Sequence, residues 1–250
     1  KMRVLFFLFV LSISYDSFAK ETLNIAVASN FYEPIKLIKK KFEKKNEVNV
    51  KVIKGSTAQL YAQIINRAPV DIFLSADQIT PRKIDRNLVV QNSQFTYAIG
   101  KLVFWTSLKY DKTKSSKIFL ESEKIKILSI ANPSISPYGK ASKEFLKNLG
   151  IWKRYKNKLV LANNINQVVS FLYSGNADSG LISFSDRIKL KKLYNGSFLD
   201  VPENFYKPLK QDAILLKRSQ NSAFAKKFIF FLKSAEIKTI IRSFGYKVNW

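Results

Sequence analysis

Four turns that carry small polar residues are the part of the sequence most able to do chemistry. Each lies between a short apolar stretch and a stretch whose apolar residues recur with helical spacing, so each is expected to connect a strand to a helix. Helix N-termini present unpaired N–H groups and about half a positive charge. Several that face one cleft can bind an oxyanion without a salt bridge. The four turns are Ala28-Ser29-Asn30, Gly55-Ser56-Thr57, Ser136-Pro137-Tyr138-Gly139 and Asn164-Ile165-Asn166.

A second interpretation of these turns is purely structural. A Ser, Thr or Asn in such a place can accept hydrogen bonds from the first N–H groups of its own helix and cap it. Asn30, with Glu33 three residues later, resembles a capping box of this kind. One turn alone does not separate the two interpretations, whereas four turns of the same kind together favour anion binding.

Composition excludes several other chemistries. The chain has no cysteine and no histidine, which removes thiol chemistry, Ser-His-Asp catalysis and nearly all transition-metal sites. Asp71 and Asp77 would repel a dianion and are interpreted as a helix cap or a hinge contact, and two acids are too few for a calcium or iron site. No two acids fall on matching turns to form a catalytic carboxylate pair. We therefore expect a binding protein without a cofactor rather than an enzyme.

The elements around these turns predict an α/β protein with two lobes. Strands alternate with helices in two sets, which is typical of mostly parallel sheets with flanking helices. The first set has strands at 23–28, 48–53 and 70–74 and helices at 31–43, 58–67 and 80–87. The second set has strands at 125–130, 159–162 and 180–183 and helices at 138–149 and 165–173. The last elements are a strand at 212–217, which is expected to return to the first lobe, and helices at 219–233 and 235–244.

The two sets are expected to form a hinged cleft. A long strand at 95–106, interrupted by Gly100, is predicted to cross from one lobe to the other. Two lobes joined by two crossings can close around a ligand. The expected boundaries are 20–98 for the first part of lobe 1, 99–208 for lobe 2, and 209–250 for the C-terminal part of lobe 1.

The first 19 residues have the features of a secretory signal peptide. A short cationic start precedes an apolar run of about ten residues, too short for a membrane span of roughly 20, and Ser17-Phe18-Ala19 supplies small residues at a cleavage site. The predicted mature chain begins near Lys20 and is soluble, exported and periplasmic.

The chain is strongly basic, with a formal net charge of +25. Removing residues 1–19 takes away Lys1, Arg3 and Asp16, which leaves +24. The lysines are spread along the chain, and no basic run is interleaved with aromatic residues as a single-strand platform requires, so no nucleic-acid partner is expected. Genome composition and attraction of a small anion both account for the charge. Binding of a surface polyanion or nucleic acid stays open as a lower alternative.

Six segments, in order, resemble the periplasmic molybdate-binding proteins of ABC transporters. The resemblance covers roughly residues 22–247. The segments are 26–29, 55–64, 68–77, 132–139 (Asn132-Pro133 with Pro137-Tyr138-Gly139), 174–180 and 244–246. The resemblance implies a type II periplasmic binding protein fold, an α/β fold in which each of two lobes has a mostly parallel sheet with flanking helices.

The resemblance also implies the ligand residues. Ser29 and Thr57 match hydroxyl ligands of the oxyanion, and Tyr138 and Ile165 match residues that donate a backbone N–H. Asn30 and Ser183 are additional candidates. Molybdate would be held through its oxygens, with no direct bond between protein and metal. Because Tyr138 is expected to act through its backbone, loss of its hydroxyl is predicted to matter little.

The implied function is a monomeric receptor that binds molybdate, and also tungstate, between its lobes and delivers it to the ABC permease in the inner membrane. The same fold binding sulfate, phosphate or another small oxyanion is the alternative. Sulfate and molybdate carry the same charge, so cavity size and donor spacing must separate them. Partly protonated phosphate needs an acceptor in the site, so an inward-facing Asp would favour phosphate.

Overall fold

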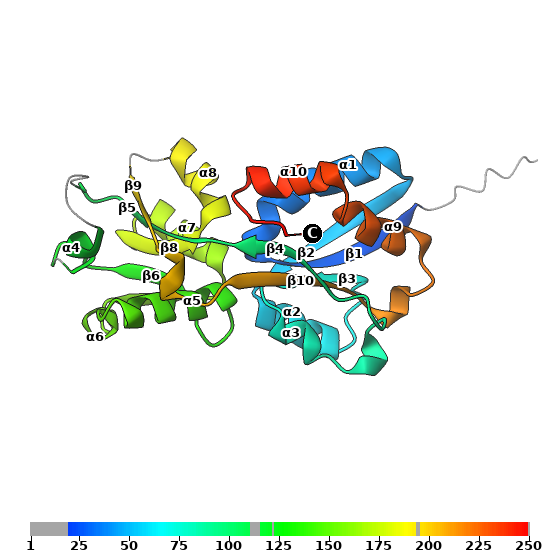
Figure 1. Cartoon of the computed structure of the whole chain (residues 1–250), viewed down its shortest axis with the longest axis horizontal. Helices are drawn as coiled ribbons and strands as arrows, with labels where there is room; N and C mark the ends of the chain where they lie inside the picture. The colour runs from blue at the N-terminus through cyan, green and yellow to red at the C-terminus, as the bar shows by residue number, and fades with distance from the viewer. Residues whose placement is uncertain (1–19, 111–115, 122, 194–195, 250) are drawn as a thin grey trace, which may run out of the picture.

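The computed structural model describes residues 20–110, 116–121, 123–193 and 196–249 (Figure 1). The predicted signal peptide, 1–19, lies outside these ranges. Within them, no helix combines the length and the apolar character that a membrane span requires.

The first sheet has the strand order β2-β1-β3-β10-β4. Its strands are β1 (Glu21–Ala28), β2 (Val48–Gly55), β3 (Ile72–Leu74), β4 (Phe95–Gly100) and β10 (Leu209–Leu215). β1 pairs in parallel with β2 and β3, whereas β10 pairs antiparallel with β3 and β4. Four of the five strands therefore point the same way, and β10 runs against them.

The second sheet repeats this arrangement with the order β7-β6-β8-β5-β9. Its strands are β5 (Leu102–Thr106), β6 (Leu128–Ala131), β7 (Leu159–Ala162), β8 (Ser179–Ser183) and β9 (Ser197–Asp200). Here β6 pairs in parallel with β7 and β8, and β5 runs antiparallel between β8 and β9. The predicted fold class, two α/β lobes with mostly parallel sheets, is confirmed.

Helices flank both sheets (Figure 1). The α-helices are α1 (Tyr32–Lys45), α2 (Thr57–Ile65), α3 (Ile79–Arg82), α4 (Ser116–Glu121), α5 (Pro137–Asn148), α6 (Trp152–Tyr155), α7 (Ile165–Tyr173), α8 (Phe184–Leu193), α9 (Ala223–Leu232) and α10 (Ala235–Ser243). The 3₁₀ turns are η1 (Ser29–Phe31), η2 (Arg86–Leu88), η3 (Glu203–Phe205) and η4 (Lys217–Ser219).

Alternation along β1 shows how the first sheet is covered on both faces. Leu23, Ile25 and Val27 pack in a core with residues of α1, α9 and α10. Ala26 points to the other face, where it joins a core that contains Leu60 of α2. Side chains on a strand point to opposite faces in turn, so one apolar strand serves two layers of helices. Most of the second lobe packs around a single larger core.

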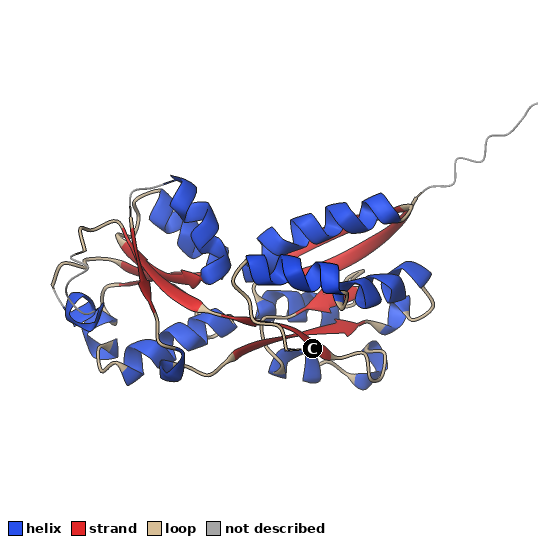
Figure 2. Ribbon diagram, turned by 45° about the horizontal axis from the view of Figure 1, so that its top comes forward, coloured by secondary structure: helices blue, strands red, loops and turns tan. Residues whose placement is uncertain are grey.

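The strand predicted over 95–106 is two strands that belong to different sheets. β4 pairs with β10 in the first sheet, and β5 pairs with β8 and β9 in the second, with only Lys101 between them (Figure 2). The second connection runs from the end of β9 at Asp200 to the start of β10 at Leu209. The break at Gly100 is thus the place where the chain changes sheets.

The helix predicted at 80–87 is also divided. α3 ends at Arg82, and a separate 3₁₀ turn covers Arg86–Leu88. The Asp85 carboxylate accepts a hydrogen bond from the N–H of Asn87 at 2.8 Å. This side chain caps η2, so the local hydrogen bonds favour the start of a separate 3₁₀ turn over continuation of α3.

Candidate oxyanion-binding site

The four predicted turns all lie where a strand of the parallel set ends and a helical segment begins. β1 leads into η1, β2 into α2, β6 into α5 and β7 into α7. The carboxyl ends of parallel strands share one edge of a sheet, which is where ligands bind in open α/β sheets. Each lobe therefore contributes two helical N-termini from its own edge.

Hydrogen bonds join these edges across the two lobes. The N–H of Ala58, in the first turn of α2, donates to the carbonyl oxygen of Ile135 at 3.2 Å. The hydroxyl of Ser185 donates to the carbonyl oxygen of Asn30 at 2.8 Å. The turns of the first lobe thus directly contact the second lobe, and the structure is a closed arrangement.

In three of the four turns a side chain caps the helix, and the capping residue lies one or two positions before the predicted ligand residue. The side chains of Ser56, Ser136 and Asn164 accept from the N–H groups of Gln59, Gly139 and Gln167, at 3.3, 3.4 and 3.1 Å. Thr57 and Ile165 are the first residues of their helices, and Tyr138 is the second. Such N–H groups have no acceptor within the helix. The capping residues and the predicted ligand residues are therefore different residues of the same turn.

The predicted ligand residues are buried at the closed edges. Ser29 is 3% exposed, Thr57 2%, Tyr138 1% and Ile165 2%. The oxygen Oγ1 of Thr57 accepts from the N–H of Ala76 at 3.2 Å, which leaves the hydroxyl proton to donate elsewhere. Thr57 also lines a pocket of 120 Å³ between the lobes, beside Lys83 of the first lobe and Lys140 of the second.

Asn30 does not form the predicted capping box. Helix α1 begins after Phe31 with no side-chain cap. The Nδ2 of Asn30 instead donates to Oε1 of Gln211 at 2.8 Å and to the hydroxyl oxygen of Tyr246 at 3.1 Å. The 3₁₀ turn η1 moves the start of α1 past Asn30, so its amide is free to bond Gln211 and Tyr246 instead of capping α1. Its role as an additional ligand donor stays a prediction.

Ser183 is fully buried at the end of β8. Its hydroxyl donates to Oδ2 of Asp186 at 2.5 Å and lies 2.9 Å from the hydroxyl of Ser185. The other oxygen of Asp186 accepts from Nδ2 of Asn166, beside Ile165, at 3.0 Å. The structure thus places Ser183 among the second-lobe turns, bonded to a buried carboxylate.

Two buried tyrosines, Tyr138 and Tyr246, bond across the contact between the lobes, and Tyr97 lies behind them in the first lobe. Burial raises the pKa of the Tyr97 and Tyr138 phenols well above the usual 10.0, and the nearby Tyr246 adds to the rise in both pKa values. Burial also raises the pKa of Tyr246, whereas its hydrogen bonds with Ser185 and Asn30 act the other way. All three phenols are therefore neutral at physiological pH and serve as hydrogen-bonding groups rather than charges.

Several residues of this contact are not among the residues that the sequence predicts. They are Tyr97, Ser185, Gln211 and Tyr246. Tyr246 lies in one of the six segments that carry the resemblance. The sequence therefore marked this residue but did not indicate its hydrogen bonds. Gln211 gives only a weak signal, a polar residue at the start of an apolar strand, and its buried partners come from distant parts of the chain.

Asp77 caps a helix, as was predicted for it, whereas Asp71 is neither a helix cap nor a hinge contact and joins β1 to η4 within the first lobe. Asp71 accepts from the N–H of Asn24 at 2.6 Å and from the Ser219 hydroxyl, and it pairs with the guanidinium of Arg218 at 3.3 Å. Asp77 accepts from the N–H and the hydroxyl of Thr80, at 2.8 and 2.9 Å, at the start of α3. Among the described residues, no three His, Cys, Asp or Glu side chains gather as metal ligands would.

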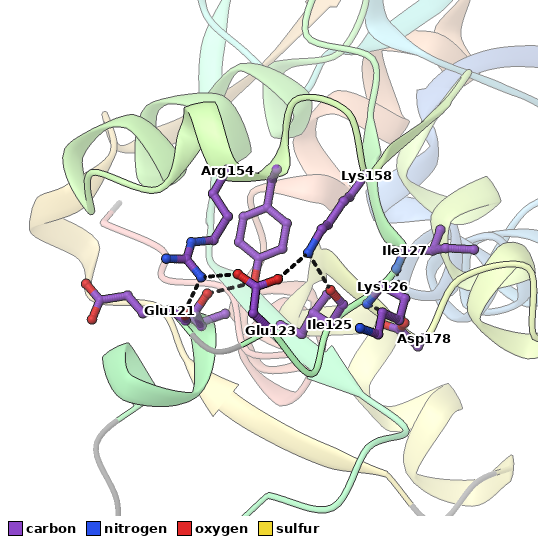
Figure 3. A network of polar contacts seen from close by, with 10 residues as sticks. Glu121, Glu123, Ile125, Lys126, Ile127, Arg154, Lys158 and Asp178 are labelled. Carbon is purple, nitrogen blue, oxygen red and sulfur yellow. Dashed lines mark hydrogen bonds and ion pairs between the residues drawn. The ribbon is translucent and has the colours of Figure 1, made fainter.

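The segment 174–180 lies at the opposite edge of the second sheet, where β8 begins. Asp178 precedes β8, and its Oδ2 accepts from the N–H groups of Lys126 and Ile127 at 2.9 and 3.0 Å (Figure 3). Nearby, Glu123 accepts from Arg154 at 2.8 Å and Lys158 at 3.1 Å. The hydrogen bond from Lys158 and the charges of both cations lower the pKa of Glu123. These hydrogen bonds hold together the segments that lead into β6 and β8, at the edge of the sheet away from the candidate site.

Comparison with known proteins places the chain in a family. Residues 23–247 match the family described as bacterial extracellular solute-binding protein. The chain belongs to this family. The family match spans all four turns and both lobes, so the candidate site lies wholly within the matched residues.

Individual members of the solute-binding family support the resemblance drawn from the six segments. The molybdate-binding protein ModA of Azotobacter vinelandii is 38% identical over 225 residues, which cover 90% of this chain and 89% of the relative. ModA of Rhodobacter capsulatus is 40% identical over 225 residues, covering 88% and 86%. The solved structure of the periplasmic molybdate-binding protein of A. vinelandii matches with a TM-score of 0.84 at 32% identity, covering 91% of this chain and 100% of that chain.

Proposed function

We propose that the protein is a receptor that binds molybdate, and also tungstate, between its two lobes. The observation that carries this proposal is the identity of 38% and 40% to relatives named molybdate-binding, over about nine-tenths of the chain. The ligand would be held through its oxygens by the hydroxyls of Ser29 and Thr57 and the N–H groups of Tyr138 and Ile165. Asn30 and Ser183 are the additional candidates.

The arrangement of donors supports an oxyanion as the ligand. Two helical N-termini from each lobe meet across the interlobe contacts, and each adds N–H groups and part of a positive charge. All of these donors are neutral and fixed by the fold. A fully deprotonated tetrahedral anion can accept hydrogen bonds from every one of them.

The buried carboxylate of Asp186 bears on the choice of anion. A partly protonated phosphate would need an acceptor, and each oxygen of Asp186, which already accepts from Ser183 or Asn166, can accept a further hydrogen bond. Asp186 therefore keeps phosphate as the alternative ligand, whereas the neutral donors suit a fully deprotonated dianion. Sulfate shares that charge, so the selectivity between molybdate and sulfate must depend on the width of the closed cavity.

The remaining parts of the proposal concern transport. Residues 20–98 and 209–250 would form one lobe and 99–208 the other, and the closed pair would deliver the anion to an ABC permease in the inner membrane. The protein would be a monomer without catalytic activity or cofactor, exported to the periplasm after removal of residues 1–19. The high positive charge would raise the rate of anion capture.

Titration calorimetry with molybdate, tungstate, sulfate and phosphate tests the proposed function. We expect molybdate and tungstate to bind with dissociation constants in the micromolar range or below, and sulfate and phosphate far more weakly. Equal affinity for sulfate and molybdate would reject the assigned ligand. Binding of polyanions alone, with a steep loss on adding salt, would instead favour a surface interaction.

A further inference from the structure

Gln211 connects the turns of the two lobes through a fully buried side chain on β10. Its Oε1 accepts from Nδ2 of Asn30 at 2.8 Å and from the hydroxyl of Tyr97 at 3.0 Å, both in the first lobe. Its Nε2 donates to the hydroxyl of Tyr138 at 3.3 Å, which reaches it from α5 of the second lobe. Both ends of the amide are engaged, so its orientation is fixed.

Two of the three partners of Gln211, Asn30 and Tyr138, belong to turns that carry proposed ligand donors. Asn30 follows Ser29 directly, and Tyr138 carries one of the backbone N–H groups proposed to bind the anion. One side chain therefore links a donor turn of the first lobe to a donor turn of the second. A ligand held by donors from both turns would depend on the distance between them.

Gly100 makes room for this link at the point where the chain changes sheets. A Cβ atom at Gly100 would lie 2.1 Å from the Tyr138 hydroxyl and 2.6 Å from Nε2 of Gln211. The backbone of Gly100 does not occupy the left-handed region, so the glycine is required for space rather than for its conformation. Any side chain here would push the phenol away from Gln211.

We propose that Gln211 and the phenol of Tyr138 are positioning residues that set the width of the anion cavity and hold the lobes closed, with Gly100 providing the space. This inference rests on the proposed function. It also changes the expectation for Tyr138, because the structure gives its hydroxyl a partner on the other lobe that the sequence did not reveal. Loss of that hydroxyl should release the anion faster, although the backbone donor is intact.

The variant Tyr138→Phe tests the link directly. We expect molybdate to dissociate about 2- to 10-fold faster, the effect of one buried hydrogen bond, and the preference for molybdate over sulfate to decrease. Stopped-flow displacement measures the rate, with an environment-sensitive dye on Ile79→Cys. Ile79 is 62% exposed and lines a pocket with Pro137 of the other lobe, and the chain has no other cysteine.

Tyr155→Phe is the matched control. Tyr155 is fully buried, and its hydroxyl donates to the carbonyl oxygen of Leu120 at 2.7 Å within the second lobe. This variant also loses one buried phenol hydrogen bond, so it should lower the melting temperature to a similar extent. Its dissociation rate and anion preference should equal those of the wild-type chain, which separates a general loss of stability from a loss of positioning.

A double-mutant cycle tests the role of Gly100. Gly100→Ala should also accelerate dissociation of molybdate. In the double variant Gly100→Ala/Tyr138→Phe, the increase in the dissociation rate should be smaller than the product of the two single increases, because the added methyl group and the hydroxyl compete for one space. Wild-type dissociation and selectivity in Tyr138→Phe, or independent effects in the cycle, would overturn the inference. A wild-type chain that binds none of the four oxyanions would overturn the proposed function and this inference with it.

Discussion

In three turns of the candidate site, the residue that caps the helix is not the residue proposed to bind the anion. Ser56, Ser136 and Asn164 cap their helices, which leaves the neighbouring Thr57 and Ile165, with Tyr138, to present unpaired N–H groups. Ser29 and Thr57 add the only side-chain hydroxyls proposed as primary ligands. Single substitutions can therefore test the proposed hydrogen bonds to the anion one by one.

Ser29→Ala and Thr57→Ala should each weaken molybdate binding by about 1–3 kcal/mol, because each removes a hydrogen bond to a charged ligand. Thr57→Ser should bind nearly as well as the wild-type chain, since the hydroxyl is retained. Titration calorimetry gives the three dissociation constants.

Ser170→Ala is the control for these variants. Ser170 lies exposed on α7, and its hydroxyl donates to the carbonyl oxygen of Asn166 one turn earlier at 3.3 Å. Its removal should leave the affinity unchanged. An unchanged affinity in Ser29→Ala would show that the ligand site lies elsewhere.

The buried phenols predict a loss of stability at alkaline pH. Burial raises the pKa of Tyr97 and Tyr138 well above 10.0 in the folded chain, whereas an unfolded chain releases these protons near pH 10. Their contribution is present below that pH and is lost as the pH rises through the folded values. Urea unfolding between pH 8 and 11 should show the decrease, and Tyr97→Phe should reduce its slope. A flat profile would contradict the buried, hydrogen-bonded arrangement.

Whole elements carry the site because helices begin where parallel strands end. A cap at such a helix both stabilises the protein and aims the N–H groups of the first turn. Asn164→Ala should lower the free energy of unfolding by about 1 kcal/mol and also weaken molybdate binding, because Ile165 follows the cap directly. Unfolding curves and calorimetry measure the two effects.

Ser234→Ala is the corresponding control at another helix. Ser234 caps α10 by accepting from the N–H of Ile237 at 3.4 Å, and α10 packs on α1 rather than on the turns of the second lobe. This variant should lose stability alone. If Asn164→Ala behaved in the same way, α7 would not present its N-terminus to the ligand.

The elements also show what the sequence could predict. Alternation of strands and helices is a local pattern, so the two α/β sets and the small polar turns followed from it, and the helix cap at Asp77 followed from the repulsion between a carboxylate and a dianion. The crossing between the lobes near Gly100 was predicted as well, but the division of this strand into β4 and β5 was not, because strand partners are decided by distant segments. The bonds of Gln211 join residues 73 and 181 positions apart, and no local pattern reports such contacts.

The donors proposed for the anion are neutral, whereas the whole chain carries a strongly positive formal charge of +25. Long-range attraction should accelerate capture of a dianion, whereas the proposed contacts to the bound anion are short-range hydrogen bonds. Raising sodium chloride from about 10 mM to 500 mM should slow association, since the Debye length is about 8 Å at physiological ionic strength, and leave dissociation nearly constant. Stopped-flow kinetics of dye-labelled Ile79→Cys would follow both rates. A dissociation rate that rises steeply with salt would mean that lysines touch the anion.

The most direct test of the central claim is a crystal structure of the molybdate complex. The account predicts anomalous density from one molybdenum atom between the lobes, with its oxygens within hydrogen-bonding distance of the Ser29 and Thr57 hydroxyls and of the N–H groups of Tyr138 and Ile165. An anion bound only to surface lysines, or held by one lobe alone, would contradict it.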